Sequence, residues 1–296
     1  MSPGADAAPG ERLKGIGYVL IAVSFFACLD TTAKYLGQSL PSLEVVWMRF
    51  VSHSLIVLVL WNPFSQPAFY RSGRIGLQVL RALFMFGATA FNFFALRYLQ
   101  LSETMAIFFA APFIVAMLAG PLLGEWAGPR RWAAIAVGFL GVVVVMRPGL
   151  GGLHWAASLS VGATLSYALY LITTRMLAAT DSPQSMLIFS AFLPAAIIAP
   201  LVFFVWETPQ TALQWVLLFS LGVFGAVGHW FLILAYRQAP APVLAPFTYG
   251  QIITMIAFGY LVFGEVPGLT TIVGAGIVIA SGLYLIARER PQKAGD

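Results

Sequence analysis

A few polar side chains lie inside long apolar runs of this sequence, and their types suit the recognition of a small charged molecule. Asn92 supplies two amide donors and one acceptor, which fit the carboxylate and ammonium groups of an amino acid. His229 can donate to a carboxylate when it is neutral, and it can report proton coupling if it titrates. The same residue types fit hydrogen bonds between helices equally well, so both interpretations stand.

Arg49 is the costliest of these residues, because its guanidinium stays charged well inside an apolar run. Such a charge needs a partner. Asp30 reaches a comparable depth in the preceding run, whereas Glu44 is more superficial. We predict an Arg49–Asp30 pair that is structural or part of a gate, with direct binding of a substrate carboxylate by Arg49 as the alternative.

Hydroxyl-bearing side chains recur at helical spacing in two other runs. Ser24 and Thr31 share one face of the run over 13–35, and Tyr167 and Tyr170 share one face of the run over 154–177. We expect these faces to line a substrate path. Ser and Thr hydroxyls also bond within helix bundles of membranes, which is the alternative for the first pair.

Two prolines mark a further part of the candidate site. Pro112 and Pro246 interrupt apolar runs, and the carbonyls that they free must bond to neighbours, water or substrate. Phe109 and Tyr249 occupy matching positions beside them and are expected to form two aromatic walls of one cavity, with Gln251 as a polar contact. Proline-induced flexibility without ligand contact is the alternative.

The sequence motifs of several enzyme classes are missing. There is no Gly-rich phosphate loop, no His-Glu-x-x-His and no Gly-x-Ser-x-Gly. The single cysteine, Cys28, excludes an intramolecular disulfide and a cysteine-based zinc site. We therefore expect no cofactor, no metal and no enzymatic activity. An intramembrane enzyme with His229 as general base on a lipid is an alternative, but it needs a second catalytic group, and none lies on that face.

The composition requires a lipid environment around these residues. The chain has 296 residues, of which 60% are hydrophobic and 9% charged, and its mean hydropathy is +0.88. A soluble domain carries about 25% charged residues, so this chain has too few to cover a water-exposed surface. Its net charge of +5 comes from scattered Lys and Arg, which indicates membrane topology rather than nucleic-acid binding.

The apolar runs predict ten membrane-spanning helices. A helix needs about 20 mostly apolar residues to cross a bilayer. Pro, Gly and charged residues separate the runs. The predicted spans cover 13–35, 44–61, 76–96, 102–123, 131–146, 154–177, 184–205, 213–236, 242–263 and 269–287. The expected fold class is therefore an all-α integral membrane protein.

Lys and Arg residues predict that both termini are cytoplasmic. With the N-terminus inside, twelve Lys and Arg residues, Arg81 among them, are assigned to the inside, whereas the outside holds only Lys34, Arg97 and Arg147. This asymmetry is typical of multi-pass proteins of the bacterial inner membrane.

The chain repeats itself at an offset of 140 residues. Arg97 falls on Arg237, and Gly124-Glu125 falls on Gly264-Glu265. Because each half has an odd number of spans, the second half must insert in the opposite orientation. The sequence thus predicts two inverted five-helix repeats, an architecture typical of transporters that open a central site to each side in turn.

This repeat divides the chain into four segments. We predict a disordered cytoplasmic tail over 1–12, a first five-helix repeat over 13–149, a second over 150–288 and a cytoplasmic tail over 289–296. The run over 13–35 is expected to stay as the first span, because it is long for a signal peptide and lacks a clear cleavage site.

Three segments of the second half carry a family resemblance: Ala235–Pro242, Ala245–Tyr249 and the Gly-Glu turn within Phe263–Pro267. The chain resembles the EamA-type branch of the drug/metabolite transporter superfamily over nearly its whole length. The resemblance implies that spans one, three, four, six, eight and nine surround a central cavity, and that spans five and ten are peripheral. Within the branch, the chain is most similar to bacterial aromatic amino-acid exporters.

We therefore expect a secondary transporter of the bacterial inner (plasma) membrane that exports amino acids, including aromatic and neutral ones, by alternating access. Its expected partners are a small-molecule substrate and the lipid bilayer, with no nucleic acid and no obligate protein partner. An exporter of drugs or of another small metabolite is the alternative. Proton-driven antiport and facilitative export both stay open, since few carboxylates lie inside the spans.

Overall fold

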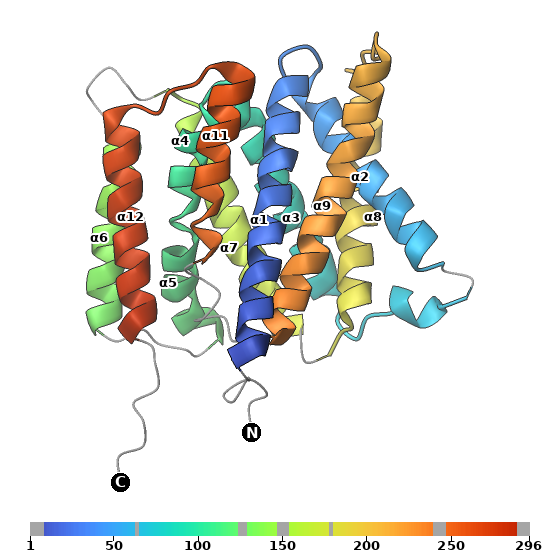
Figure 1. Cartoon of the computed structure of the whole chain (residues 1–296). Helices are drawn as coiled ribbons and strands as arrows, with labels where there is room; N and C mark the ends of the chain where they lie inside the picture. Colours follow the sequence, from blue (N-terminus) through green and yellow to red (C-terminus); the bar gives the residue numbers. More distant parts are fainter. Residues whose placement is uncertain are drawn as a thin grey trace.

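The computed structural model describes residues 9–62, 65–123, 129–146, 154–177, 180–238 and 247–288. Across these residues the regular structure is helical, with a short 3₁₀ helix η1 (Pro67–Tyr70) and no strand. The helices stand side by side in one bundle (Figure 1). They are α1 (Pro9–Leu36), α2 (Ser42–Leu60), α3 (Ile75–Leu96), α4 (Leu101–Phe108), α5 (Ala111–Leu123), α6 (Pro129–Met146), α7 (Ala157–Leu177), α8 (Pro183–Val202), α9 (Ala212–Gln238), α11 (Gln251–Phe263) and α12 (Leu269–Arg288).

Apolar helices of membrane-spanning length dominate this bundle. By length and composition, seven segments of the described chain could each cross a bilayer. Three further apolar helices, within α6, α11 and α12, are shorter. The expected all-α membrane architecture is thus confirmed, while the number of ten crossings stays a prediction.

The fourth predicted span, over 102–123, coincides with a single candidate membrane span, Leu101–Leu122, which is interrupted near Pro112 as expected. α4 ends at Phe108 and α5 begins at Ala111, with a turn at Phe109 and Ala110 between them. Pro112 causes the break, because it has no N–H to donate and disfavours helical geometry at the preceding residue. Pro112 itself lies in the first turn of α5, a position where helices tolerate proline.

The two halves of the chain are interleaved. α1 packs along α9, and α3 packs along α7. At the 140-residue offset, α1 corresponds to α7 and α3 to α9, so each of these contacts is the equivalent of the other. α6 packs along its own equivalent, α12, at one edge of the bundle (Figure 1). Helices from both halves therefore meet at the centre.

Corresponding helices of the two halves run in opposite directions. Near the end of α1, Lys34 donates a hydrogen bond to the Leu96 carbonyl at the end of α3 (3.1 Å). Just before α7, the Trp155 ring packs on Tyr98, which follows α3 (4.8 Å between ring centroids). The end of α1 and the start of α7 thus share one end of the bundle. The start of α1 and the end of α12 lie at the other end (Figure 1).

A glycine determines how closely α9 approaches α2. A Cβ atom on Gly222 would lie 2.5 Å from the backbone nitrogen of His53, closer than real Cβ contacts. We expect Gly222→Ala to lower the free energy of unfolding by about 1–3 kcal/mol, because the helix backbones must separate. Thermal unfolding of the purified protein in detergent measures this loss.

Gly76→Ala is the matched control for this prediction. Gly76 lies in the first turn of α3, and no atom lies within 4 Å of the Cβ it would carry. Alanine favours the helix at such a site, so this variant is expected to be as stable as the wild type or slightly more so. Equal stability of both variants would mean that the α2–α9 contact is loose.

Candidate functional site

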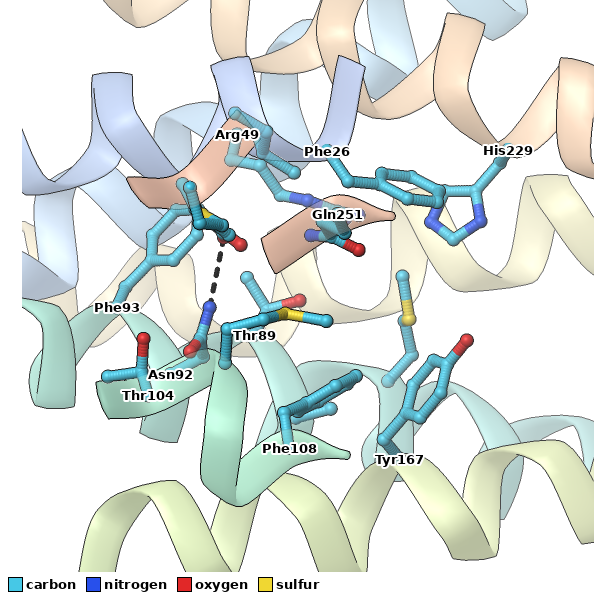
Figure 2. A pocket seen from close by; sticks show the side chains of 16 residues that line it. Phe26, Arg49, Thr89, Asn92, Phe93, Thr104, Phe108, Tyr167, His229 and Gln251 are labelled. Carbon is cyan, nitrogen blue, oxygen red and sulfur yellow. Dashed lines mark hydrogen bonds between the residues drawn. The ribbon is translucent and has the colours of Figure 1, made fainter. Parts of the chain in front are cut away.

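A cavity lies at the centre of the bundle, where helices of both halves meet (Figure 2). Its lining comes from α1, α2, α3, α4, α7, α9 and α11. The space open to the centre of a water molecule is about 130 Å³, several times the 10–15 Å³ or so that one water needs. The helices match those that the family resemblance implied, with α2 as an addition through Arg49. The polar lining residues are Asp30, Arg49, Thr89, Asn92, Thr104, His229 and Gln251.

Asp30 and Asn92 form a hydrogen bond across this cavity. Asn92 of α3 donates from its amide nitrogen to Oδ1 of Asp30 in α1 (3.0 Å; Figure 2). Asn92 therefore links two helices and also lines the cavity, while its contact with a substrate stays a prediction. The carboxyl group of Asp30 adds an acidic side chain to an otherwise largely apolar wall.

Arg49 lines the same cavity but does not form the ion pair predicted with Asp30. In the described part of the chain the one salt bridge within 4.0 Å joins other residues, and the Asp30 carboxylate accepts from Asn92 instead. The Arg49 side chain is 2% exposed, and its Nε and Nη1 atoms are buried without a hydrogen-bond partner. Its guanidinium lies over the neighbouring Phe50 ring, 4.4 Å from the centroid.

Two histidines are electrostatic neighbours of Arg49, one in helix α9 and one in α2 itself. His229 of α9 lines the cavity, as predicted, and its ring meets Phe26 edge-on (5.0 Å between centroids; Figure 2). His53 lies one helical turn after Arg49 in α2 and is 2% exposed. Sequence reasoning missed His53, although the spacing of four residues places it on the same helix face as Arg49.

Aromatic and thioether side chains form the rest of the wall. Phe108 of α4 packs on Tyr167 of α7 (4.8 Å between centroids), and both line the cavity, as Figure 2 shows. Met85, Met105 and Met255 complete an apolar surface. Such a surface accepts flat rings by stacking and cations over ring faces.

Ser24 and Thr31, both expected on the substrate path, do not line the cavity. The Ser24 hydroxyl donates to the Leu20 carbonyl (2.8 Å), and the Thr31 hydroxyl donates to the Ala27 carbonyl (2.7 Å). Both bonds lie within α1, so the structure favours the alternative that these hydroxyls satisfy their own helix.

Three predicted aromatic residues also lie outside the cavity lining. Phe109 and Tyr249 are close, as expected for matching positions, with ring centroids 4.9 Å apart, but they pack on each other as buried side chains. The Tyr170 hydroxyl accepts a hydrogen bond from Arg81.

The two predicted prolines do not line the cavity as far as the structure describes them. Pro112 is exposed at the start of α5, and Pro246 falls outside the described residues.

Arg81 is a buried arginine that sequence reasoning assigned to the cytoplasmic side. It lies in α3 and is 3% exposed. Its guanidinium donates to Thr174 Oγ1 (2.7 Å), Ser190 Oγ (2.8 Å) and the Tyr170 hydroxyl (2.9 Å). A bond to the Met186 carbonyl adds a fourth partner. The sequence already indicates a buried position for Arg81, because the residue lies inside the membrane span predicted over 76–96.

The Gly-Glu turn of the second half joins three helix ends. Gly264 adopts a positive φ of 68°, which ends α11 and turns Glu265 back toward the bundle. Glu265 forms a salt bridge with Lys34 of α1 (2.7 Å) and accepts from the Leu101 nitrogen at the start of α4 (3.1 Å). Glu265 thus caps the start of α4. Glu125, its counterpart, falls outside the described residues.

A second polar cluster, around Asp181, lies at the end of the bundle opposite to the Lys34–Glu265 salt bridge. Asp181, between α7 and α8, accepts from Gln78 Nε2 (2.7 Å), the Ser72 hydroxyl and the Gly73 nitrogen. Burial tends to raise the pKa of Asp181, but these donors together hold the pKa below its ordinary value. Asp181 is therefore ionised at neutral pH and joins the segment before α3 to the α7–α8 connection.

A helical membrane bundle of two interleaved repeats around a central cavity of mixed polarity belongs to the class of membrane transport proteins. The particular family follows from sequence comparison. The chain belongs to the EamA-like transporter family, whose model matches residues 13–147 and 154–288. It is therefore a multi-pass membrane transporter rather than an enzyme.

Named relatives carry small metabolites. The chain is 30% identical to the S-adenosylmethionine uptake transporter of Rickettsia prowazekii and 26% identical to the riboflavin transporter of Vibrio cholerae, over 94% of each chain. A solved crystal structure shares the fold, with a TM-score of 0.64 and 13% identity over 95% of this chain and 99% of its own. The names of these relatives support a metabolite transporter and do not support the narrower expectation of an aromatic amino-acid exporter.

Proposed function

We propose that this protein moves a small organic metabolite through the central cavity by alternating access. In this proposal ten crossings form two inverted five-helix repeats over 13–149 and 150–288, in the bacterial inner membrane. The tails over 1–12 and 289–296 lie in the cytoplasm. Support comes from corresponding helices that run in opposite directions and from a cavity built by both halves.

S-adenosylmethionine is the first candidate cargo. The observation that carries this choice is the Asp30 carboxylate in a cavity walled by Phe26, Phe108 and Tyr167. S-adenosylmethionine combines a sulfonium and an ammonium cation with a flat purine. A carboxylate attracts the cations, and aromatic faces accept both the cations and the purine. The named Rickettsia relative adds independent support.

Neutral and aromatic amino acids are the second candidate. They share the ammonium and carboxylate groups of S-adenosylmethionine and carry an apolar side chain that the same wall accepts. Riboflavin, the cargo named for the Vibrio relative, has an aromatic ring but no cationic group to pair with Asp30. The charges of this cavity therefore favour the first two candidates over riboflavin.

Flux measurements on the purified protein in liposomes test the proposal. Labelled S-adenosylmethionine, phenylalanine and riboflavin are offered in turn, in both directions and with or without a pH gradient. We expect saturable flux of S-adenosylmethionine, competed by the unlabelled compound. A dependence of the flux on the gradient would indicate proton coupling, and independence would indicate facilitated transport.

The outcomes separate the candidates. Flux of phenylalanine without flux of S-adenosylmethionine would replace the first candidate by the second. Flux of riboflavin alone would contradict the role given to Asp30. Absence of flux for all three compounds, in vesicles shown to be intact and to contain folded protein, would overturn the proposed cargo class.

A further inference from the structure

Arg49 is a buried cation whose hydrogen-bond donors are not satisfied by the protein. The side chain is 2% exposed, and its Nε and Nη1 atoms are buried without a partner. Within the described residues the Arg49 side chain forms no hydrogen bond or salt bridge, although its backbone carbonyl accepts from Ser52 Oγ (3.4 Å). A guanidinium cannot escape the cost by losing its proton, so such an arrangement is expensive unless an anion completes it.

The other buried arginine shows what a structural arginine looks like in this bundle. Arg81 donates to four protein oxygens in α7 and α8, at 2.7–2.9 Å. Arg81 does not line the cavity, whereas Arg49 does. The two residues are equally buried and differ in whether their donors have partners. We therefore expect the missing partner of Arg49 to be a group on a ligand that enters the cavity.

The carboxylate within the cavity does not fill this role. Asp30 lines the same cavity but lies beyond salt-bridge distance of Arg49, and its Oδ1 accepts from Asn92 at 3.0 Å. The acidic side chain of Asp30 and the basic side chain of Arg49 attract each other electrostatically, but no hydrogen bond or salt bridge joins them. Two separate charges of opposite sign suit a ligand that carries both signs itself.

We infer that Arg49 binds the carboxylate of the substrate and that Asp30 attracts its ammonium group, so that the cargo is an α-amino acid or a conjugate that keeps the amino-acid head group. The inference rests on the proposed function and narrows it. A guanidinium offers a planar pair of N–H donors that matches the two oxygens of a carboxylate. The aromatic and methionine wall then accepts the remaining part of the substrate, whether a purine or an apolar side chain.

Ligand pairs that differ only in the carboxylate test this inference. The pairs are S-adenosylmethionine with its decarboxylated form, and phenylalanine with phenethylamine. For each ligand, the KM of transport in liposomes and the ligand-induced rise in melting temperature are measured for the wild type, Arg49→Gln and Arg81→Gln.

In the wild type, we expect loss of the carboxylate to raise the KM about tenfold to a hundredfold, as for a lost hydrogen bond to a charged group. In Arg49→Gln, the two members of each pair are expected to bind almost alike. Arg81→Gln is the matched control, because it removes a buried arginine outside the cavity. It is expected to lower stability while keeping the wild-type preference for the carboxylate.

The results distinguish the inference from the proposed function. Transport without any preference for the carboxylate member overturns the inference alone, as does an unchanged preference in Arg49→Gln. Stabilisation of the wild type by chloride, to the same extent as by the carboxylate ligands, would make Arg49 a site for inorganic anions and would also overturn it. Absence of transport and of thermal stabilisation for all four ligands contradicts the proposed function itself.

A folding defect of Arg49→Gln does not prevent the test. Arg49→Lys keeps the charge and loses the planar fork, so it is expected to retain part of the preference. The comparison of ligand pairs on the wild-type protein also stands by itself, because it needs no variant.

Discussion

Replacing Asp30 by asparagine is expected to lower the transport of S-adenosylmethionine by about tenfold to a hundredfold. The variant keeps the size of the side chain but removes the negative charge of the cavity wall. A hydrogen bond or ion pair to a charged group contributes about 1.5–3 kcal/mol, which corresponds to that range of affinity. Initial rates in liposomes over a range of substrate concentrations measure the effect, which should appear mainly as a higher KM.

Controls separate the charge of Asp30 from its structural bond. Asp30 accepts from Asn92, and an asparagine at this position can still accept that bond through its amide oxygen. The melting temperature of Asp30→Asn should therefore stay close to that of the wild type. Cys28→Ser, two residues earlier in α1 and outside the cavity lining, should transport normally. Normal transport by Asp30→Asn would show that the carboxylate has no part in binding.

The Lys34–Glu265 salt bridge is expected to give the largest effect on stability. It joins α1 of the first half to the turn after α11 of the second half, at 2.7 Å, with the side chains 8% and 16% exposed. Removing one partner of a buried pair leaves an uncompensated charge, which costs up to about 3–5 kcal/mol. We expect the lower part of that range for Glu265→Gln, because the Lys34 ammonium still donates to the carbonyls of Leu96 and Leu99.

A double-mutant cycle of Lys34→Met, Glu265→Gln and the double variant isolates this interaction. Thermal unfolding in detergent should give a coupling free energy of about 2–3 kcal/mol. Glu103→Gln is the control. Glu103 lies in the first turn of α4, next to the Leu101 nitrogen that Glu265 binds, but it accepts a hydrogen bond from the Gln100 nitrogen (3.1 Å) and forms no salt bridge with Lys34. The effects of Lys34→Met and Glu103→Gln on the free energy of unfolding should add up in the double variant. Additive effects of Lys34→Met and Glu265→Gln would mean that the pair contributes no net stability.

Lys34 and Glu265 also bear on the transport cycle. In this structure they hold one end of the bundle together, and the Asp181 cluster holds the other end. Alternating access requires one end to open while the other is closed, so the salt bridge must break once in each cycle of the proposed mechanism. Variants that weaken it should therefore change the rate of transport as well as the stability.

The main elements of the fold could be predicted from the sequence because lipid imposes a simple rule. Helices that cross a bilayer need long apolar runs, and such runs are visible without any knowledge of packing. The segment over 102–123 is such a run, and Pro112, which was expected to interrupt it, divides it into α4 and α5. Its proline was visible in the sequence, but the residue at which the helix would end depends on which turn the neighbouring helices stabilise.

Some of the predicted site residues line the cavity and others do not, for one physical reason. Asn92, Tyr167, His229 and Gln251 line the cavity as expected, whereas Ser24 satisfies its own helix. Helical spacing shows which residues share a face, but it does not show which neighbour that face meets or which rotamer each side chain adopts.

The membrane class, the helical runs, the internal repeat and the family can be predicted from the order of the amino acids, since each of these depends on composition and on spacing along the chain. The partners of the buried charges depend on how the helices pack. From the sequence, Arg49 and Asp30 are expected at similar depths in consecutive helices. In the structure, Asp30 accepts a hydrogen bond from Asn92 of α3, and two nitrogen atoms of Arg49 have no hydrogen-bond partner. Arg81 and Lys34 obtain their partners from helices far away in the chain. Such pairings depend on distances of a few tenths of an ångström between helices, and these are set by side-chain packing across the whole bundle.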